Sequence, residues 1–255
     1  MTEAVRVAVD AARKAGVVLR DGFERPMDVA LKSPRELVTA LDRASEDIIA
    51  GTILDVFPHD GILAEEGASK GGSSDRVWIV DPLDGTNNYA HGYPFFSVAI
   101  AVEERGKPVA GVVHDPLRDE TFVAERGAGA TLNGRPLRVT ATGRLADSLV
   151  ATGFPYDRSE GTENNLANLG RFILAVRGIR RAGSAELDLS YVACGRLDGY
   201  WELGLKAWDV AAGGLIVREA GGVVTNFGGA GWDHRRGDIV ASNGHIHAEM
   251  LSIIR

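Results

Sequence analysis

The feature that most constrains the fold is a row of short, β-rich segments between residues 61 and 127. Each segment is apolar and bounded by turn-forming residues, in the order GILAEEG, RVWIVDP, FFSVAIAVEE, PVAGVVHD and ETFVAERG. Short apolar runs separated by turns are typical of consecutive paired strands, so this region predicts a meandering sheet. The Asn133-Gly134 pair in TLNGRPL is a strong signal for a two-residue turn and predicts a hairpin at that point.

Helical periodicity lies on both sides of this region. Apolar side chains recur at helical spacing in residues 3–22, and a second helix is expected over roughly 35–56, opened by SPRE. From about residue 148 the expected order is strand SLVATG, helix 163–177, strand IRRAG, helix Ser184 to Cys194, strand GYWEL, helix WDVAAGGLIVREAGG, strands VVTNF and DIVAS, and a terminal helix. We therefore expect an α+β layered sandwich, a single domain over 1–255 with two closely packed halves, 1–147 and 148–255.

Charge and composition exclude several function classes. The chain has 255 residues and a net charge of −7, whereas a nucleic-acid binder needs a concentrated basic face, so no direct nucleic-acid binding is expected. The single Cys194 cannot form an internal disulfide, and no apolar run approaches the ~20 residues that span a bilayer. We expect a cytoplasmic protein that does not cross a membrane.

The stretch DPLDGT places two carboxylates at the end of an apolar strand. Asp81 follows Val77–Val80, and an ionised carboxylate at that depth requires a partner. Pro82 fixes the backbone, Gly85 permits a tight turn, and backbone N–H groups at Gly85 and Thr86 would suit a phosphate if a helix starts there. Taken alone, the motif is equally consistent with an ordinary polar turn.

Further carboxylates lie at the ends of other predicted elements. Glu65 and Glu66 follow the strand GILA, and Asp209 stands where a helix begins; alone, these would be a solvated loop and a helix cap. Together with DPLDGT they favour Mg²⁺, which prefers hard oxygen ligands. The His245-x-His247 pair is expected at the surface rather than in a zinc site. Because Mg²⁺ ions can activate water and stabilise a leaving oxygen, the pattern predicts Mg²⁺-dependent phosphate ester hydrolysis.

The same residues resemble the signatures of the inositol monophosphatase family. WIVDPLDGTNNYAHGYPFFSVAIAV is similar to the family's first signature and WDVAAGGLIVREAGG to its second. The resemblance extends through LKSPRELVTALD, ILAEEG and GSAELDLSYVACGRLDGYWELG, and so covers nearly the whole chain. It implies the α/β/α/β/α sandwich that this family shares with fructose-1,6-bisphosphatase. It also implies a homodimer, two to three Mg²⁺ ions per subunit, and inhibition by Li⁺.

The resemblance also implies a set of metal ligands. Glu65, Asp81 and the backbone carbonyl of Leu83 match the residues that hold the first Mg²⁺, which activates the attacking water. Asp81, Asp84 and Asp209 match the ligands of a second ion, which binds the leaving ester oxygen. A third, weaker ion in the family also uses Glu65.

Catalytic and substrate-binding roles are implied in the same way. Thr86, with Asp42 behind it, matches the pair that orients and deprotonates the water, and Gly85 and Thr86 match the backbone donors to phosphate. Without the resemblance, Thr86 reads as a helix cap, Asp42 as a solvated helix residue and Glu202 as an exposed strand residue. The substrate hydroxyl groups would meet Asp84, Gly183, Ser184, Ala185, Glu202 and Asp209.

Glu186 departs from the family pattern, because many members carry a small residue there. Its side chain either points away from the presumed substrate turn or changes specificity.

Three alternatives compete with an inositol-1-phosphate phosphatase. DPLDGT has two residues between its aspartates, where the haloacid-dehalogenase signature has one, so its second aspartate is misplaced for that chemistry. Related phosphatases act on fructose-1,6-bisphosphate, histidinol phosphate or 3′-phosphoadenosine 5′-phosphate, and residues 154–190 and the surroundings of Glu202 are expected to decide among them. Thirdly, the basic clusters RRAG and HRRGD suit a regulatory protein that binds a partner and whose phosphatase activity is incidental.

Overall fold

A seven-stranded sheet forms the core of the N-terminal part of the chain. The computed structural model describes residues 1–25, 29–33, 36–156 and 164–254. The strand order is β3 (Gly61–Ala64), β4 (Arg76–Asp84), β5 (Ser97–Glu104), β6 (Lys107–Asp115), β7 (Glu120–Glu125), β8 (Gly129–Leu132) and β9 (Arg135–Pro136). From β4 to β9 consecutive strands pair antiparallel, which confirms the predicted meander for these strands. The prediction is wrong for β3, which pairs with β4 in parallel. Asn133 and Gly134 both have positive φ (48° and 78°), which confirms the hairpin between β8 and β9.

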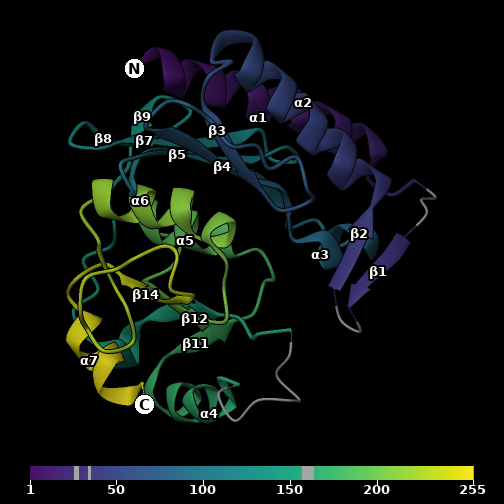
Figure 1. Cartoon of the computed structure of the whole chain (residues 1–255). Helices are drawn as coiled ribbons and strands as arrows, with labels where there is room; N and C mark the ends of the chain where they lie inside the picture. Colours follow the sequence, from purple (N-terminus) through teal and green to yellow (C-terminus); the bar gives the residue numbers. More distant parts are fainter. Residues whose placement is uncertain (26–28, 34–35, 157–163, 255) are drawn as a thin grey trace.

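Two helices cover one face of this sheet (Figure 1). They are α1 (Glu3–Gly22) and α2 (Ala40–Val56). The buried stripe of α1 consists mainly of alanines, which brings the helix close to the sheet. A Cβ at Gly16 would lie 2.6 Å from the ring of His114 on β6, so this approach requires glycine.

A second, five-stranded sheet belongs to the C-terminal part. Its order is β11 (Gly178–Arg180), β10 (Leu149–Thr152), β12 (Gly199–Leu203), β14 (Asp238–Ser242) and β13 (Val223–Thr225). Between the two sheets lie α5 (Ala185–Ala193) and α6 (Ala211–Glu219), packed in one core with Phe122 of β7 and Tyr200 of β12. On the far face, α4 (Leu166–Ala175) and α7 (His247–Ile253) pack on Trp201.

The five layers are therefore helices, sheet, helices, sheet, helices, as Figure 1 shows from top to bottom. The predicted α+β sandwich of α/β/α/β/α type is confirmed. The boundary at residues 147 and 148 stays a prediction. None of the helices described is both long and apolar enough to cross a bilayer.

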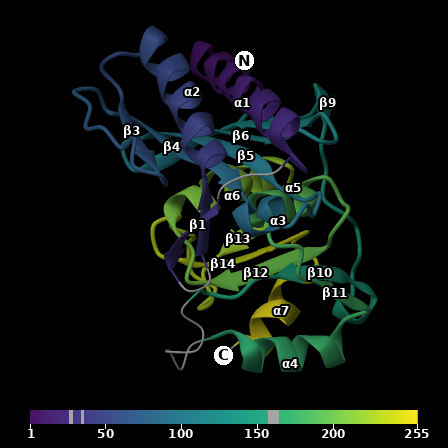
Figure 2. The same ribbon diagram turned by 90° about the vertical axis from the view of Figure 1, so that its right-hand side faces the viewer.

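The predicted helix over 35–56 begins later than expected. Residues Glu36–Thr39 form β2, which pairs antiparallel with β1 (Val29–Ser33) in a separate hairpin that contacts α3 (Thr86–Ala90) (Figure 2). The helix starts at Ala40 because Thr39 and Asp42 cap it reciprocally. This capping box, and not SPRE, sets the start of α2.

The expectation for the histidine pair is correct for one of its members. His245 is exposed, but His247 is buried, and its ring contacts Thr225 Oγ1 at 3.0 Å and Ser242 Oγ at 2.9 Å. His247 faces inward because it begins α7, whose buried side packs on the small sheet.

Candidate active site

A β-bulge re-aims the carboxylates of DPLDGT. Asp81 pairs with Ala99 on β5 and Asp84 pairs with Ser97, so β4 uses one more residue than its partner across this step. Gly85 follows with φ 103°, and a Cβ there would lie 3.1 Å from the carbonyl oxygen of Phe95. The bend predicted from Pro82 and Gly85 is present, and α3 begins directly after it at Thr86.

Asp84 joins the two halves of the molecule. Its Oδ2 accepts hydrogen bonds from Ser184 Oγ (2.5 Å), Glu186 N (2.8 Å) and Ser97 Oγ (3.3 Å). Its Oδ1 accepts one from Ala185 N (3.1 Å). Two of the predicted substrate-binding residues, Ser184 and Ala185, therefore lie against Asp84 at the start of α5. Burial raises the pKa of Asp84 to about 6, although these hydrogen bonds oppose the shift.

Thr86 and Asp42 are in direct contact, as the resemblance implied. Thr86 Oγ1 lies 3.0 Å from Asp42 Oδ1 and 3.1 Å from the carbonyl oxygen of Leu83. Asp42 Oδ2 accepts hydrogen bonds from the backbone N (2.8 Å) and Oγ1 (2.6 Å) of Thr39. Asp42 is fully buried, so reading it as a solvated helix residue is wrong. The capping box buries it by turning the first turn of α2 toward α3.

Asp81 lies within the electrostatic reach of the other predicted ligands. It is 2% exposed, and burial, followed by the charges of Glu65, Asp84 and Asp209, raises its pKa well above the usual range. The hydrogen bond from Leu83 N to Asp81 Oδ1 (3.0 Å) opposes this shift. The pKa of Asp209 is also raised well above normal, by burial first and then by the charges of Glu65, Asp84 and Glu202.

Glu202 lies at the end of β12, on the other sheet. It is half-buried, its carboxylate accepts a hydrogen bond from the hydroxyl of Tyr200, and burial raises its pKa to about 7. A Cβ at Gly153 would collide with this carboxylate, so a larger residue there would displace the Glu202 side chain. Asp188 is buried nearby, and burial and the charge of Glu202 raise its pKa.

The predicted metal-binding side chains are not arranged around a common metal position in this structure. Across the described ranges, 1–25, 29–33, 36–156 and 164–254, no three His, Cys, Asp or Glu side chains converge tightly enough to hold a metal ion as they stand. The metal-binding, catalytic and substrate-binding roles implied by the resemblance therefore stay predictions.

Two buried glutamates, Glu46 and Glu186, were not predicted to be functional residues. Glu46 lies on α2, one helical turn after Asp42, and accepts hydrogen bonds from the backbone around Glu65. Its spacing of four residues from Asp42 was the available signal. Glu186, singled out by its departure from the family pattern, is fully buried and points toward α6, so it faces away from solvent.

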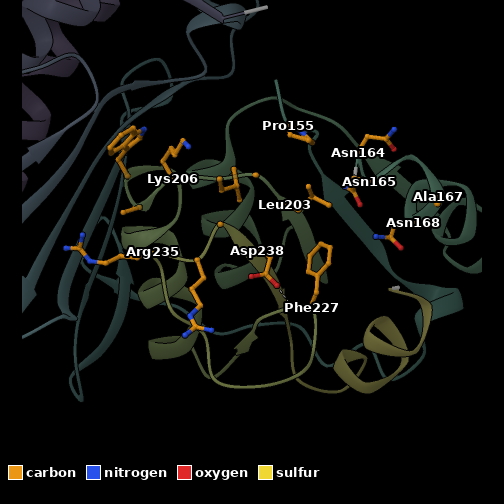
Figure 3. Close-up of a pocket in the computed structure, with 16 residues that line it drawn as sticks. Pro155, Asn164, Asn165, Ala167, Asn168, Leu203, Lys206, Phe227, Arg235 and Asp238 are labelled. Carbon is orange, nitrogen blue, oxygen red and sulfur yellow. Dashed lines mark hydrogen bonds between the residues drawn. The ribbon is translucent and has the colours of Figure 1, made fainter. Parts of the chain in front are cut away.

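A cavity of about 1100 Å³ has none of the predicted metal-binding carboxylates among its lining residues (Figure 3). It is lined by Pro155, Asn165, Leu203, Lys206, Phe227 and Asp238, among others. The prominent polar groups in it already have partners: Asn165 Nδ2 bonds Thr152 and Gly153, and Asp238 Oδ2 accepts from Phe227 N. Its lining includes Pro155 and Asn165 from the region 154–190 that is expected to decide specificity, of which residues 157–163 lie outside the described residues, and Leu203 next to Glu202.

Comparison with known proteins identifies the family of this chain. The sequence profile described as "Inositol monophosphatase family" matches residues 1–255. The chain belongs to the inositol monophosphatase family. The two signatures and ILAEEG, on which the resemblance was based, thus lie in a chain that matches the family from end to end.

Individual relatives carry two kinds of name. The chain is 45% identical to "Nus factor SuhB" of Pasteurella multocida, over 100% of this chain and 97% of that protein. It is also 45% identical to "Inositol-1-monophosphatase" of Mesorhizobium japonicum, over 98% of this chain and 96% of that protein. Among solved structures, "extragenic suppressor protein suhB" of Bartonella henselae matches with a TM-score of 0.95 and 45% identity, covering 100% of this chain and 99% of that one.

Proposed function

We propose that this protein is a Mg²⁺-dependent phosphomonoester hydrolase whose preferred substrate is myo-inositol 1-phosphate. The observation that carries the proposal is the electrostatic cluster around Asp81, where burial and three neighbouring carboxylates all disfavour ionisation. Such a cluster is costly unless cations neutralise it. Family membership and the relative from Mesorhizobium japonicum named inositol-1-monophosphatase support the chemistry and the substrate.

The donor set suits Mg²⁺. It consists of carboxylates and a backbone carbonyl, which are hard oxygen ligands. Glu65, Asp81 and the carbonyl of Leu83 would hold one ion, Asp81, Asp84 and Asp209 a second, and Glu65 would also serve a third. When bound, the ions would lower the pKa of a water molecule and neutralise charge on the leaving oxygen.

Thr86 and Asp42 would then receive the proton from the attacking water. Asp42 Oδ2 accepts hydrogen bonds from Thr39, whereas Asp42 Oδ1 faces Thr86 Oγ1 at 3.0 Å. The Thr86 hydroxyl donates to Asp42 and can accept from water at the same time. We infer that Asp42 Oδ1 is the proton acceptor and that no phosphoenzyme forms.

The remaining substrate contacts follow from the same cluster. Backbone N–H groups at Gly85 and Thr86 would bind the phosphate. The inositol hydroxyl groups would meet Asp84, Gly183, Ser184, Ala185, Glu202 and Asp209. The carboxyl groups of Glu202 and Asp209 can exchange hydrogen bonds with the hydroxyl groups of a polyol.

Phosphate release from a panel of substrates tests this proposal. The panel contains inositol 1-phosphate, fructose-1,6-bisphosphate, histidinol phosphate and 3′-phosphoadenosine 5′-phosphate, each with Mg²⁺, with EDTA, and with Mg²⁺ plus Li⁺. We expect Mg²⁺-dependent release that is fastest with inositol 1-phosphate and inhibited by Li⁺. A different preferred substrate would contradict the substrate assignment, and release unaffected by EDTA would contradict the metal chemistry.

We also propose a cytoplasmic homodimer, with α4 at or near the contact between subunits. Leu166, Ile173 and Leu174 are 53%, 63% and 89% exposed on this helix, an unusual grouping for a free surface. Sedimentation or light scattering should give twice the chain mass of 27.1 kDa. Leu174→Glu should shift the protein toward the monomer, whereas Val223→Glu, at an exposed apolar residue on β13 that is not part of this group, should not.

A second function as a partner-binding protein is suggested by the relative named Nus factor SuhB. The basic clusters are the candidate surface, although Arg235 is paired with Glu103 and Arg236 with Asp233. Direct binding of nucleic acid is still not expected. A phenotype that survives loss of hydrolysis in an Asp209→Ala strain would favour this function.

A further inference from the structure

Three glutamates in the described part of the chain bind the backbone in the same way. In each, the two carboxylate oxygens accept hydrogen bonds from two nearby backbone N–H groups, an arrangement here called a carboxylate clamp. Glu46 binds Glu66 N and Ala68 N, both at 2.7 Å. Glu186 binds Ala212 N at 3.2 Å and also Gly213 N. Glu219 binds Gly127 N and Gly129 N, both at 3.0 Å.

The Glu46 clamp fixes the segment that carries Glu65. The two clamped residues, Glu66 and Ala68, lie one and three residues after Glu65, and Gly67 between them has φ 118°, so the chain turns tightly there. Glu46 is 4% exposed and lies on α2, one helical turn after Asp42. Charge-assisted bonds of this kind are stronger than neutral ones. Glu46 of α2 therefore fixes the path of the chain after β3, and with it the position of Glu65.

The Glu186 clamp fixes the segment that carries Asp209. Helix α6 begins without a side-chain cap of its own, because its N-cap residue is Val210. The backbone N–H groups of Ala212 and Gly213 in the first turn have no acceptor within the helix, and they donate instead to the carboxylate of Glu186, which is fully buried on α5. Asp209 lies in the 3₁₀ turn Ala207–Asp209 immediately before this helix.

Glu186 also contacts Asp84. Its backbone N–H donates to Asp84 Oδ2 at 2.8 Å, while its side chain holds α6. One residue thus connects the two aspartates that are predicted to share an ion with Asp81. The approach needs Gly213, since a Cβ there would lie 2.5 Å from Glu186 Oε2.

We propose that Glu186 and Glu46 are positioning residues for the carboxylates around Asp81. Glu186 sets the separation of Asp84 and Asp209, and Glu46 sets the position of Glu65. This inference rests on the proposed function of these carboxylates in binding Mg²⁺. Glu219 has the same bonding but clamps a loop of the large sheet that carries none of the predicted ligands, so it provides a matched control.

Glutamine substitutions test the proposal, because glutamine keeps the size of the side chain but replaces one acceptor oxygen with a donor. Each of E186Q, E46Q and E219Q should lose one backbone hydrogen bond and some thermal stability. In E186Q and E46Q, the Mg²⁺ concentration for half-maximal phosphate release should rise roughly 10- to 100-fold, as is found for residues that orient metal ligands. In E219Q it should not change.

A second measurement separates this inference from the proposed function. The rise in melting temperature on adding Mg²⁺ without substrate reports metal binding directly. It should be smaller in E186Q and E46Q than in the parent protein and E219Q, even if the parent hydrolyses none of the substrates tested. Equal Mg²⁺ responses in all three variants, or no response in the parent protein, would overturn the inference.

Discussion

Replacing Asp81 with asparagine is expected to abolish Mg²⁺-dependent phosphate release and to raise the melting temperature of the metal-free protein. Activity should be lost because Asp81 is the one residue predicted to contact both principal ions. Stability should rise because asparagine removes a buried charge repelled by Glu65, Asp84 and Asp209, while its side-chain oxygen still accepts from Leu83 N. Phosphate release and thermal melting in EDTA check the two effects.

Asp60 provides the control for this substitution. It is as buried as Asp81, at 5% exposed, but its carboxylate accepts hydrogen bonds from Ser74 Oγ (2.6 Å) and Trp78 Nε1 (2.9 Å). Asp60→Asn should therefore lower the melting temperature in EDTA. A lower melting temperature in Asp81→Asn as well would show that the charge on Asp81 is not a source of strain in the metal-free protein.

The same cause predicts how the stability of the metal-free protein depends on pH. The folded-state pKa values of Asp81 and Asp84 lie above the unfolded value of about 3.9, so the folded protein binds more protons between these values and stability falls as the pH rises. The fall should begin near pH 4 and continue through about 6, the pKa of Asp84, whose share is about 3 kcal/mol. Asp81→Asn should show a shallower fall in the free energy of unfolding.

Replacing Thr86 with valine is expected to lower kcat by a factor of about 10² to 10⁴, the usual range for loss of a positioned proton-transfer group. Valine has nearly the shape of threonine but cannot connect the water to Asp42 Oδ1, which Thr86 Oγ1 now contacts at 3.0 Å. KM and the Mg²⁺ half-saturation should change little, since the predicted ligands are untouched. Steady-state kinetics at saturating Mg²⁺ separate kcat from KM.

Thr86→Ser is the matched control, because it keeps the hydroxyl group and should retain most of kcat. If serine and valine at residue 86 were equally impaired, the methyl group and packing would matter rather than proton transfer. If valine retained kcat, the proposed path from water through Thr86 to Asp42 would be wrong.

Much of the fold was predictable because its signals are local. The strand pattern of residues 61–127, the Asn133-Gly134 turn and the helices near 3–22 and 184–194 depend on short-range periodicity and turn chemistry. The start of α2 was misplaced, because SPRE and the Thr39–Asp42 capping box are both plausible helix starts. Pairing of residues 36–39 with β1 in a hairpin, which leaves them outside the helix, decided between them.

The sequence by itself determined the chemistry available to this protein: carboxylates at the ends of β3 and β4 and before α6, and a glycine bend beside them. The tertiary structure decided which of these groups act on one another. Asp84 and Ser184, separated by 100 residues, are joined only because α5 packs between the two sheets. The roles of Glu46 and Glu186 likewise arise from contacts with backbone on other elements, and such contacts have no periodicity in the chain that carries them.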